Sequence, residues 1–220
     1  MRKILTLIMA VWSLMAVAAS QEVVVEFEDG TTKNLVLKDK FFVPLLNIQD
    51  NNLKFEDPVT GKKESYSTDL IKSVSYTSDG KDYKVVYSNV YDIKLGNPYK
   101  ASEKLSKHRR MLSEVYKGKN ITVYAMEVLQ NAGPGGTVRY IYTYFQRNGE
   151  FPKYVVSVPI SGIRVGGVNM QKYLLNYFTE EDFVKRIKTG EFDLKKVKDW
   201  SVEHMVEIAK AYDENRIPSK

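Results

Sequence analysis

The stretch that decides the fold is residues 121–160, ITVYAMEVLQNAGPGGTVRYIYTYFQRNGEFPKYVVSVPI. Three runs rich in β-branched and aromatic residues, which favour strands, cover residues 121–128, 138–146 and 154–160. A loop of glycine and proline separates the first two runs, and Asn148-Gly149, a pair typical of hairpin turns, separates the last two. The stretch therefore predicts a three-stranded antiparallel meander.

The residues after the meander predict helices. Bulky apolar residues are concentrated in residues 170–178, and a second helix is expected to start near Thr179 and to end at Gly190. Ser201 is a candidate N-cap for a last helix that carries Met205, Ile208, Ala209 and Tyr212. We therefore assign residues 170–220 to a C-terminal helical segment.

The residues before the meander predict a linking helix. Leu105, Met111, Leu112 and Val115 recur at roughly helical spacing between charged residues, and Gly118 would end an amphipathic helix. With the meander, this helix forms the expected unit of residues 97–169.

Residues 21–96 predict a small β module. Val23, Val25 and Phe27 alternate with glutamates, the period of a half-buried strand, and Asp29-Gly30 follows as a hairpin turn. Further short strands and tight turns predict a barrel-like or rolled antiparallel sheet, with Pro44 marking an edge or bend in the apolar run Phe41–Leu46. The whole chain is expected to be α+β: this module, the linking helix, the meander and the helical C-terminus.

Residues 1–20 have the pattern of a secretory signal peptide. Arg2 and Lys3 precede an uncharged apolar stretch that ends in small residues, and cleavage after Ala18 or Ser20 fits equally well. The stretch is shorter than the roughly 20 apolar residues of a spanning helix, so we expect removal of the leader and no integral span afterwards. The expected location is outside the cytoplasm.

Composition excludes several kinds of chemistry. The chain has no cysteine, which rules out disulfides, thiolate metal sites and a cysteine nucleophile. Loss of Arg2 and Lys3 with the leader lowers the formal net charge from +6 to +4, a modest excess that does not indicate nucleic-acid binding.

Several pieces occur in an order that carries a family resemblance: the leader, Asp29-Gly30, Thr60-Gly61-Lys62 before residues 70–74, Met111-Leu112 and Val115 before Gly118, and a tyrosine-rich meander leading to residues 178–192. In this order the chain resembles uncharacterised exported proteins of Bacteroidetes bacteria, over nearly the whole mature length. The resemblance implies a Gram-negative envelope location, in the periplasm. It implies no catalytic residues.

No pattern in the sequence predicts an enzyme, a metal site or a cofactor. The two histidines, His108 and His204, lie among charged neighbours, and no Gly-x-Ser-x-Gly turn accompanies any serine. The glycine clusters Gly133–Gly136 and Gly162–Gly167 lack the lysine and hydroxyl residue of a phosphate-binding loop.

Two features are candidate binding sites. Tyr140, Tyr142 and Tyr144 share one face of a predicted strand; exposed, they would suit a glycan, lipid or protein, but the favoured interpretation is that they pack under a helix. The basic residues Lys104, Lys107, Arg109 and Arg110, with His108, could meet anionic lipid headgroups or an acidic partner. The favoured interpretation is the solvated face of a helix.

The leading hypothesis is a non-catalytic exported protein that binds another envelope protein or a surface component. The first alternative is a module that binds a small amphipathic ligand, a glycan or a lipid, on the tyrosine face. A weaker alternative is a hydrolase that uses two carboxylates, which would have to converge in a cleft.

Overall fold

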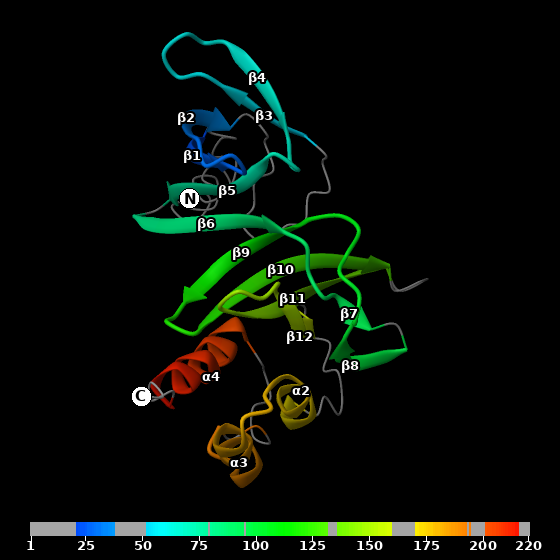
Figure 1. Ribbon diagram of the computed structural model, residues 1–220. Helices are drawn as coiled ribbons and strands as arrows, with labels where there is room; N and C mark the ends of the chain where they lie inside the picture. The colour runs from blue at the N-terminus through cyan, green and yellow to red at the C-terminus, as the bar shows by residue number, and fades with distance from the viewer. Residues whose placement is uncertain are drawn as a thin grey trace, which may run out of the picture.

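The computed structural model describes residues 21–37, 52–78, 80–94, 96–131, 136–159, 170–192, 194 and 201–215. The N-terminal hairpins lie at one end of the molecule, the long strands in the middle and the helices at the other end (Figure 1). The leader Met1–Ser20, the run Phe41–Leu46 and the clusters Gly133–Gly135 and Gly162–Gly167 lie outside the described residues.

The described part of the chain contains twelve strands and three helices. The strands are β1 (Gln21–Phe27), β2 (Thr32–Leu37), β3 (Asn52–Glu56), β4 (Lys63–Ser67), β5 (Ile71–Ser78), β6 (Lys81–Ser88), β7 (Ile93–Lys94), β8 (Asn97–Ala101), β9 (Arg110–Lys117), β10 (Ile121–Asn131), β11 (Thr137–Arg147) and β12 (Lys153–Pro159). The helices are α2 (Met170–Tyr177), α3 (Glu181–Thr189) and α4 (Val202–Asn215). The fold is thus mostly antiparallel sheet with a helical C-terminus, as expected for the α+β class.

Ten of these strands form one sheet in the order β12-β11-β10-β9-β6-β5-β1-β2-β3-β4, and β7 and β8 form a separate pair. The three-stranded meander is confirmed as β10, β11 and β12, with β9 as a fourth strand on its inner side. β6 pairs with β9 along residues 84–88, so the N-terminal hairpins and the meander share one continuous sheet.

The first hairpin follows the predicted pattern. Val23, Val25 and Phe27 are buried in β1. The side chain of Asp29 accepts hydrogen bonds from the N–H (2.9 Å) and the hydroxyl (2.7 Å) of Thr31, and Gly30 takes a positive φ of 82°. The Asp-Gly turn thus fixes the register in which the alternating residues of β1 reach the core.

The linking helix predicted over residues 97–119 is wrong, because β8, a connecting loop and β9 occupy that range. Met111 and Leu112 explain the error: they are adjacent in a strand, so they point to opposite faces of the sheet. Met111 packs into the core of the N-terminal hairpins, and Leu112 packs into the core under the meander. Two buried neighbours in a strand between two cores resemble one stripe of a helix in sequence.

The helices lie against one face of the meander. Figure 1 shows α4 beside β9 and β10, with α2 and α3 further out. Phe145 of β11 packs edge-on against Tyr177 at the end of α2, with ring centroids 5.3 Å apart. Gly190, in the left-handed conformation at φ 85°, ends α3 as predicted. None of the helices in the described ranges has the length and apolar character needed to cross a bilayer.

Candidate functional site

The chain that leaves β6 runs along the outer edge of β12 and carries Asp92 to the rim of the meander. The N–H of Tyr91 donates to the carbonyl of Pro152 (2.9 Å), and the N–H of Tyr154 donates to the carbonyl of Tyr91 (2.8 Å). A parallel bridge joins Tyr91 to Lys153 between these bonds. The edge strand thereby fixes the position of Asp92.

The loop of residues 102–109 between β8 and β9 is fastened to the same segment by Ser106. The Ser106 hydroxyl accepts the N–H of Val90 (3.1 Å) and donates to the carbonyl of His108 (2.7 Å). The Ser106 N–H donates to the carbonyl of Val90 (2.8 Å), and the side-chain amide of Asn89 donates to the Ser106 carbonyl (2.8 Å). Ser106 therefore positions the loop, and its hydroxyl is already engaged on both sides.

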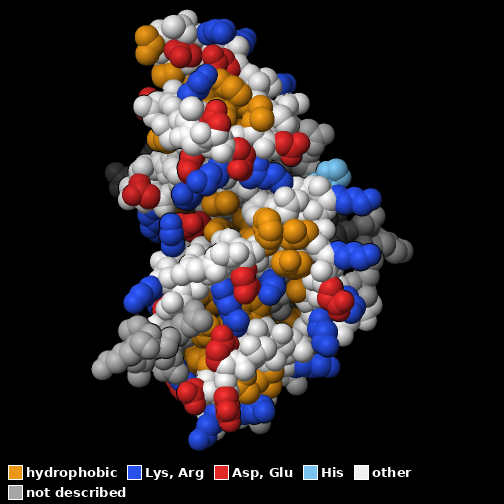
Figure 2. All heavy atoms as spheres, in the orientation of Figure 1, with side chains coloured by type: hydrophobic (Ala, Val, Ile, Leu, Met, Phe, Trp, Pro, Cys, Tyr) orange, Lys and Arg blue, Asp and Glu red, His pale blue; other side chains and the backbone are white. Residues whose placement is uncertain are grey.

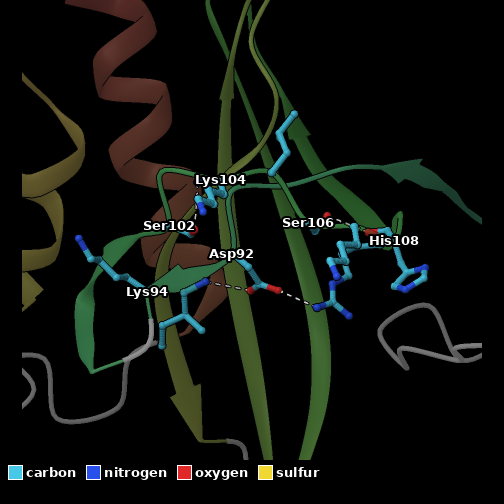
Figure 3. A pocket seen from close by; sticks show the side chains of 10 residues that line it. Asp92, Lys94, Ser102, Lys104, Ser106 and His108 are labelled. Atoms are coloured by element: carbon cyan, nitrogen blue, oxygen red, sulfur yellow. Dashed lines mark hydrogen bonds and ion pairs between the residues drawn. The ribbon is translucent and has the colours of Figure 1, made fainter.

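The side chain of Asp92 joins β7, β9 and the meander. Its Oδ1 accepts hydrogen bonds from the N–H of Ile93 (3.0 Å) and from the hydroxyl of Tyr144 (3.0 Å), and its Oδ2 accepts one from Nη2 of Arg110 (2.8 Å). Burial and the neighbouring charge of Asp92 raise the pKa of Tyr144 well above its ordinary value, so the hydroxyl remains a donor. Figure 3 shows Asp92 between Lys94 on one side and His108 on the other.

A surface pocket of about 500 Å³ opens around these groups. Its cationic side chains are Lys94, Lys104, Lys107 and Arg110, and Asp92 is the one carboxylate among the described residues that line it. Figure 2 shows Lys and Arg side chains along the right-hand border of the view, over the region of β7, β8 and the loop before β9. The site is hollow and positively charged, which suits an anionic group.

The four predicted basic residues divide into two roles. Lys104 and Lys107 are exposed and line the pocket. Arg110 lines it too, but it is paired with Asp92. Arg109 is drawn to the N-terminal hairpins, where it donates to Glu28 and to the carbonyls of Asp69 and Tyr87. The basic residues therefore lie on a loop and at the start of a strand, where the sequence predicted a helix.

The predicted tyrosine row is largely covered. Tyr142 and Tyr144 are 6% and 0% exposed, and Tyr140 is half-buried. Tyr142 and Tyr144 pack against Tyr154 of β12, with ring centroids 5.4 Å and 6.1 Å apart. Tyr144 lies on the face opposite Phe145, so the row packs around Asp92 and Tyr154, and Phe145 meets the end of α2. Two of the three residues thus offer no open surface to a ligand.

The two histidines differ in their contacts with serine residues. His108 is exposed at the pocket, where the Ser106 hydroxyl donates to its carbonyl and not to its ring. Nδ1 of His204 lies 3.2 Å from both the main-chain nitrogen and the hydroxyl oxygen of Ser201, the residue that precedes α4, and it accepts the main-chain N–H as in a capping box. Within the described ranges, no group of three or more His, Asp or Glu side chains could hold a metal ion.

Four polar residues of the site were not predicted from the sequence: Asp92, Lys94, Ser102 and Ser106. Asp92 lies 18 residues before its partner Arg110. Ser102 and Ser106 follow β8, in the range that was predicted as a helix. The one clue in the sequence is the turn residue Gly96, which adopts a positive φ of 77° at the β7–β8 hairpin.

Comparisons with models of protein families, with curated proteins and with solved structures give no match.

Proposed function

We propose that this chain is a non-catalytic exported protein that binds another envelope protein or a surface component through an anionic group held in the pocket beside Asp92. The observation that carries the proposal is the concave site of about 500 Å³, lined by Lys94, Lys104, Lys107 and Arg110 against one carboxylate. Charge of one sign in a concave site attracts and orients an oppositely charged partner.

The arrangement of the site supports binding. Arg110, Asp92 and Ser106 are engaged in the hydrogen bonds that shape the pocket, which leaves the exposed lysines as the groups that face a partner. The export part of the proposal rests on the signal-peptide pattern of residues 1–20.

The experiment is capture of partners from the envelope fraction of the source cells, with the mature protein as bait. Three baits are compared: the natural chain, Lys104→Glu with Lys107→Glu, and a control with Lys185→Glu and Lys188→Glu. The control makes the same change of charge at exposed positions of α3, far along the chain from the pocket.

We expect the natural and control baits to retain the same component and the pocket variant to lose it. Capture by the natural and control baits should weaken as salt is added. Equal capture by all three baits would contradict the proposal. Turnover of a substrate from a broad hydrolase panel, abolished by a single substitution of an acidic residue or a histidine, would contradict the non-catalytic assignment.

A further inference from the structure

Two of the three lysines of the pocket hold charge that the described residues do not neutralise. Lys104 and Lys107 make no ion pair within the described part of the chain. Lys94 lies 3.3 Å from Glu103, whose side chain is 88% exposed, and an exposed pair of this kind is weak and readily exchanged. Three ammonium groups are thus available to a ligand with more than one negative charge.

The guanidinium of Arg110 is less available. Its Nη2 is held by Asp92, and its Nε is shielded from solvent without a hydrogen-bond partner. A planar carboxylate binds most specifically to a free guanidinium fork, through two parallel hydrogen bonds. Here the fork is partly occupied, and the remaining cations are lysines, which bind phosphate as point charges without a fixed planar geometry.

Ser102 adds a neutral donor beside these lysines. Its Oγ accepts the N–H of Lys104 (3.1 Å), which leaves the hydroxyl hydrogen to donate into the pocket. Ser102 and Lys104 are both drawn at the centre of Figure 3, on the same side of Asp92 as Lys94. A tetrahedral group with three outer oxygens would find ammonium and hydroxyl donors together.

The pocket also has room for more than a bare anion. Its volume of about 500 Å³ lies within the roughly 300–1,000 Å³ of ligand sites. Ile93 and Leu105 contribute apolar surface, and Leu105 is 38% exposed. An organic group that carries the anion could rest on these two side chains.

We infer that the group recognised in this pocket is a phosphate monoester, held by Lys94, Lys104, Lys107 and the hydroxyl of Ser102. The inference rests on the proposed function and narrows it to one class of anion. A phosphate monoester carries close to two negative charges at neutral pH, which matches the unneutralised lysines better than the single charge of a carboxylate. Its source is either a soluble phosphorylated molecule or the headgroup of a phosphorylated lipid.

The test is calorimetric titration of the mature protein with phenyl phosphate, phenyl sulfate and benzoate, three probes that share a ring and differ in the anion. At about pH 8, where the phosphate is a dianion, we expect phenyl phosphate to bind roughly tenfold tighter than either monoanion, the equivalent of one charged hydrogen bond. Lys104→Ala with Lys107→Ala should abolish this preference. Lys185→Ala with Lys188→Ala, a matched change on α3, should keep it.

Vesicles of phosphatidylcholine that contain phosphatidic acid separate the two sources. Binding of these vesicles that phenyl phosphate displaces supports a lipid headgroup; binding of phenyl phosphate without binding of the vesicles supports a soluble ligand. Equal affinities for the three probes, or a preference that survives the pocket substitutions, would overturn the inference. In that case capture of a partner that depends on Lys104 and Lys107 would still uphold the proposed function.

Discussion

The carboxylate of Asp92 holds three strands together at the rim of the pocket. It accepts hydrogen bonds from the main-chain N–H of Ile93, the guanidinium of Arg110 and the hydroxyl of Tyr144, which belong to β7, β9 and β11 respectively. Tyr144 is fully buried, so its hydroxyl would lack a partner if Asp92 moved. The shape of the pocket therefore depends on the hydrogen bond between Asp92 and the buried Tyr144.

Tyr144→Phe tests this bond. Removal of a hydrogen bond to a charged acceptor should lower the free energy of unfolding by about 1.5–3 kcal/mol. Tyr140→Phe is the control, because Tyr140 lies on the same face of β11 and is half-buried; its effect should stay within about 0.5 kcal/mol. Urea unfolding measures the free energy of unfolding of both variants. Equally small losses in the two would show that the hydrogen bond between Tyr144 and Asp92 does not stabilise the fold.

Gly118 lies where a side chain would collide with α4. A Cβ at this position would overlap the carboxylate of Asp213, which accepts hydrogen bonds from the hydroxyl of Tyr116 (2.9 Å) and from the N–H groups of Lys119 (3.1 Å) and Asn120 (2.7 Å). Gly118 is therefore required for the close approach of the turn to α4, and it is not the helix stop that the sequence predicted.

Gly118→Ala should cost about 1–3 kcal/mol, because the overlap forces Asp213 out of its hydrogen bonds. A double-mutant cycle with Asp213→Ala identifies the obstacle: in the Asp213→Ala background the same glycine substitution should cost clearly less. Additive effects in chemical unfolding would mean that the strain arises elsewhere.

Local residue patterns predicted the hairpin turns, but they did not predict the contacts of Asp92 at the pocket. Asp29-Gly30 and Asn148-Gly149 were recognisable because positive φ angles restrict the choice of residue, and Gly149 does adopt φ 78°. Asp92 could not be recognised, because its three partners come from positions 93, 110 and 144 and no local pattern records such contacts.

At the level of elements, the meander was predictable and β9 was not. In β10 and β11 long β-branched and aromatic runs are bounded by strong turn residues, so the strands are evident whichever face is buried. In β9, burial of Met111 and Leu112 on opposite faces hides the alternation on which strand prediction depends. The strand β9 therefore lacks the alternation of buried and exposed residues that would distinguish it from a helix in the sequence.

The helical layer is linked to the sheet by Glu180, which precedes α3. Its Oε1 accepts the hydroxyl of Tyr212 of α4 (2.7 Å), and its Oε2 accepts Nη2 of Arg147 of β11 (3.0 Å). Burial opposes ionisation of Glu180, but the hydrogen bond from Tyr212 and the charge of Arg147 outweigh it, so the pKa is lowered from its ordinary 4.5.

Glu180→Ala should reduce stability by about 1–3 kcal/mol at neutral pH, because it leaves Tyr212 and Arg147 without their shared acceptor. A lowered pKa in the folded state stabilises the fold above the ordinary pKa of 4.5, and this contribution disappears as the pH falls through the folded-state pKa. The difference between the natural chain and the variant should therefore shrink in acid.

Glu181→Ala is the control for this element, since Glu181 is exposed in the first turn of α3. Its cost should be a few tenths of a kcal/mol, about the value of a charge at a helix N-terminus. Urea midpoints measured across the acid range compare the two variants, and a loss at Glu180 that is independent of pH would contradict the ionic contribution.

In the whole molecule, two cores share one sheet. Val85 and Tyr87 of β6 face the N-terminal core, while Val86 between them packs against the core under the meander and helices. The sequence predicted strands on either side of this junction but not the junction itself, because β9, the strand that pairs with β6, was predicted as part of a helix.

Tyrosines buried in both cores make the whole fold sensitive to alkali. Burial raises the pKa of Tyr76, in the N-terminal core, and of Tyr124, in the other, from 10.0 to about 12. In the unfolded chain these groups ionise from their ordinary pKa. Their contribution to stability is therefore complete below pH 10 and is lost as the pH rises toward 12.

We expect urea midpoints to be steady up to about pH 9 and to fall above pH 10, with several phenols losing their protons only as the chain unfolds. Ultraviolet absorbance of phenolate, recorded with and without urea, follows these groups directly. If phenolate formed in the folded protein as readily as in the denatured one, the tyrosines would not be protected and the expected loss of stability would be absent.

The short bridge at Tyr91 bears on self-association. An edge strand with free N–H and C=O groups can pair with a strand of another copy, and such pairing is a common first step of aggregation. At the start of β12 such pairing is blocked, because the main chain of Tyr91 already bonds to the carbonyl of Pro152 and to the N–H of Tyr154. A strand of another copy could pair here only if it displaced the segment that carries Asp92. The segment that shapes the pocket therefore also protects the start of β12 from edge-to-edge association.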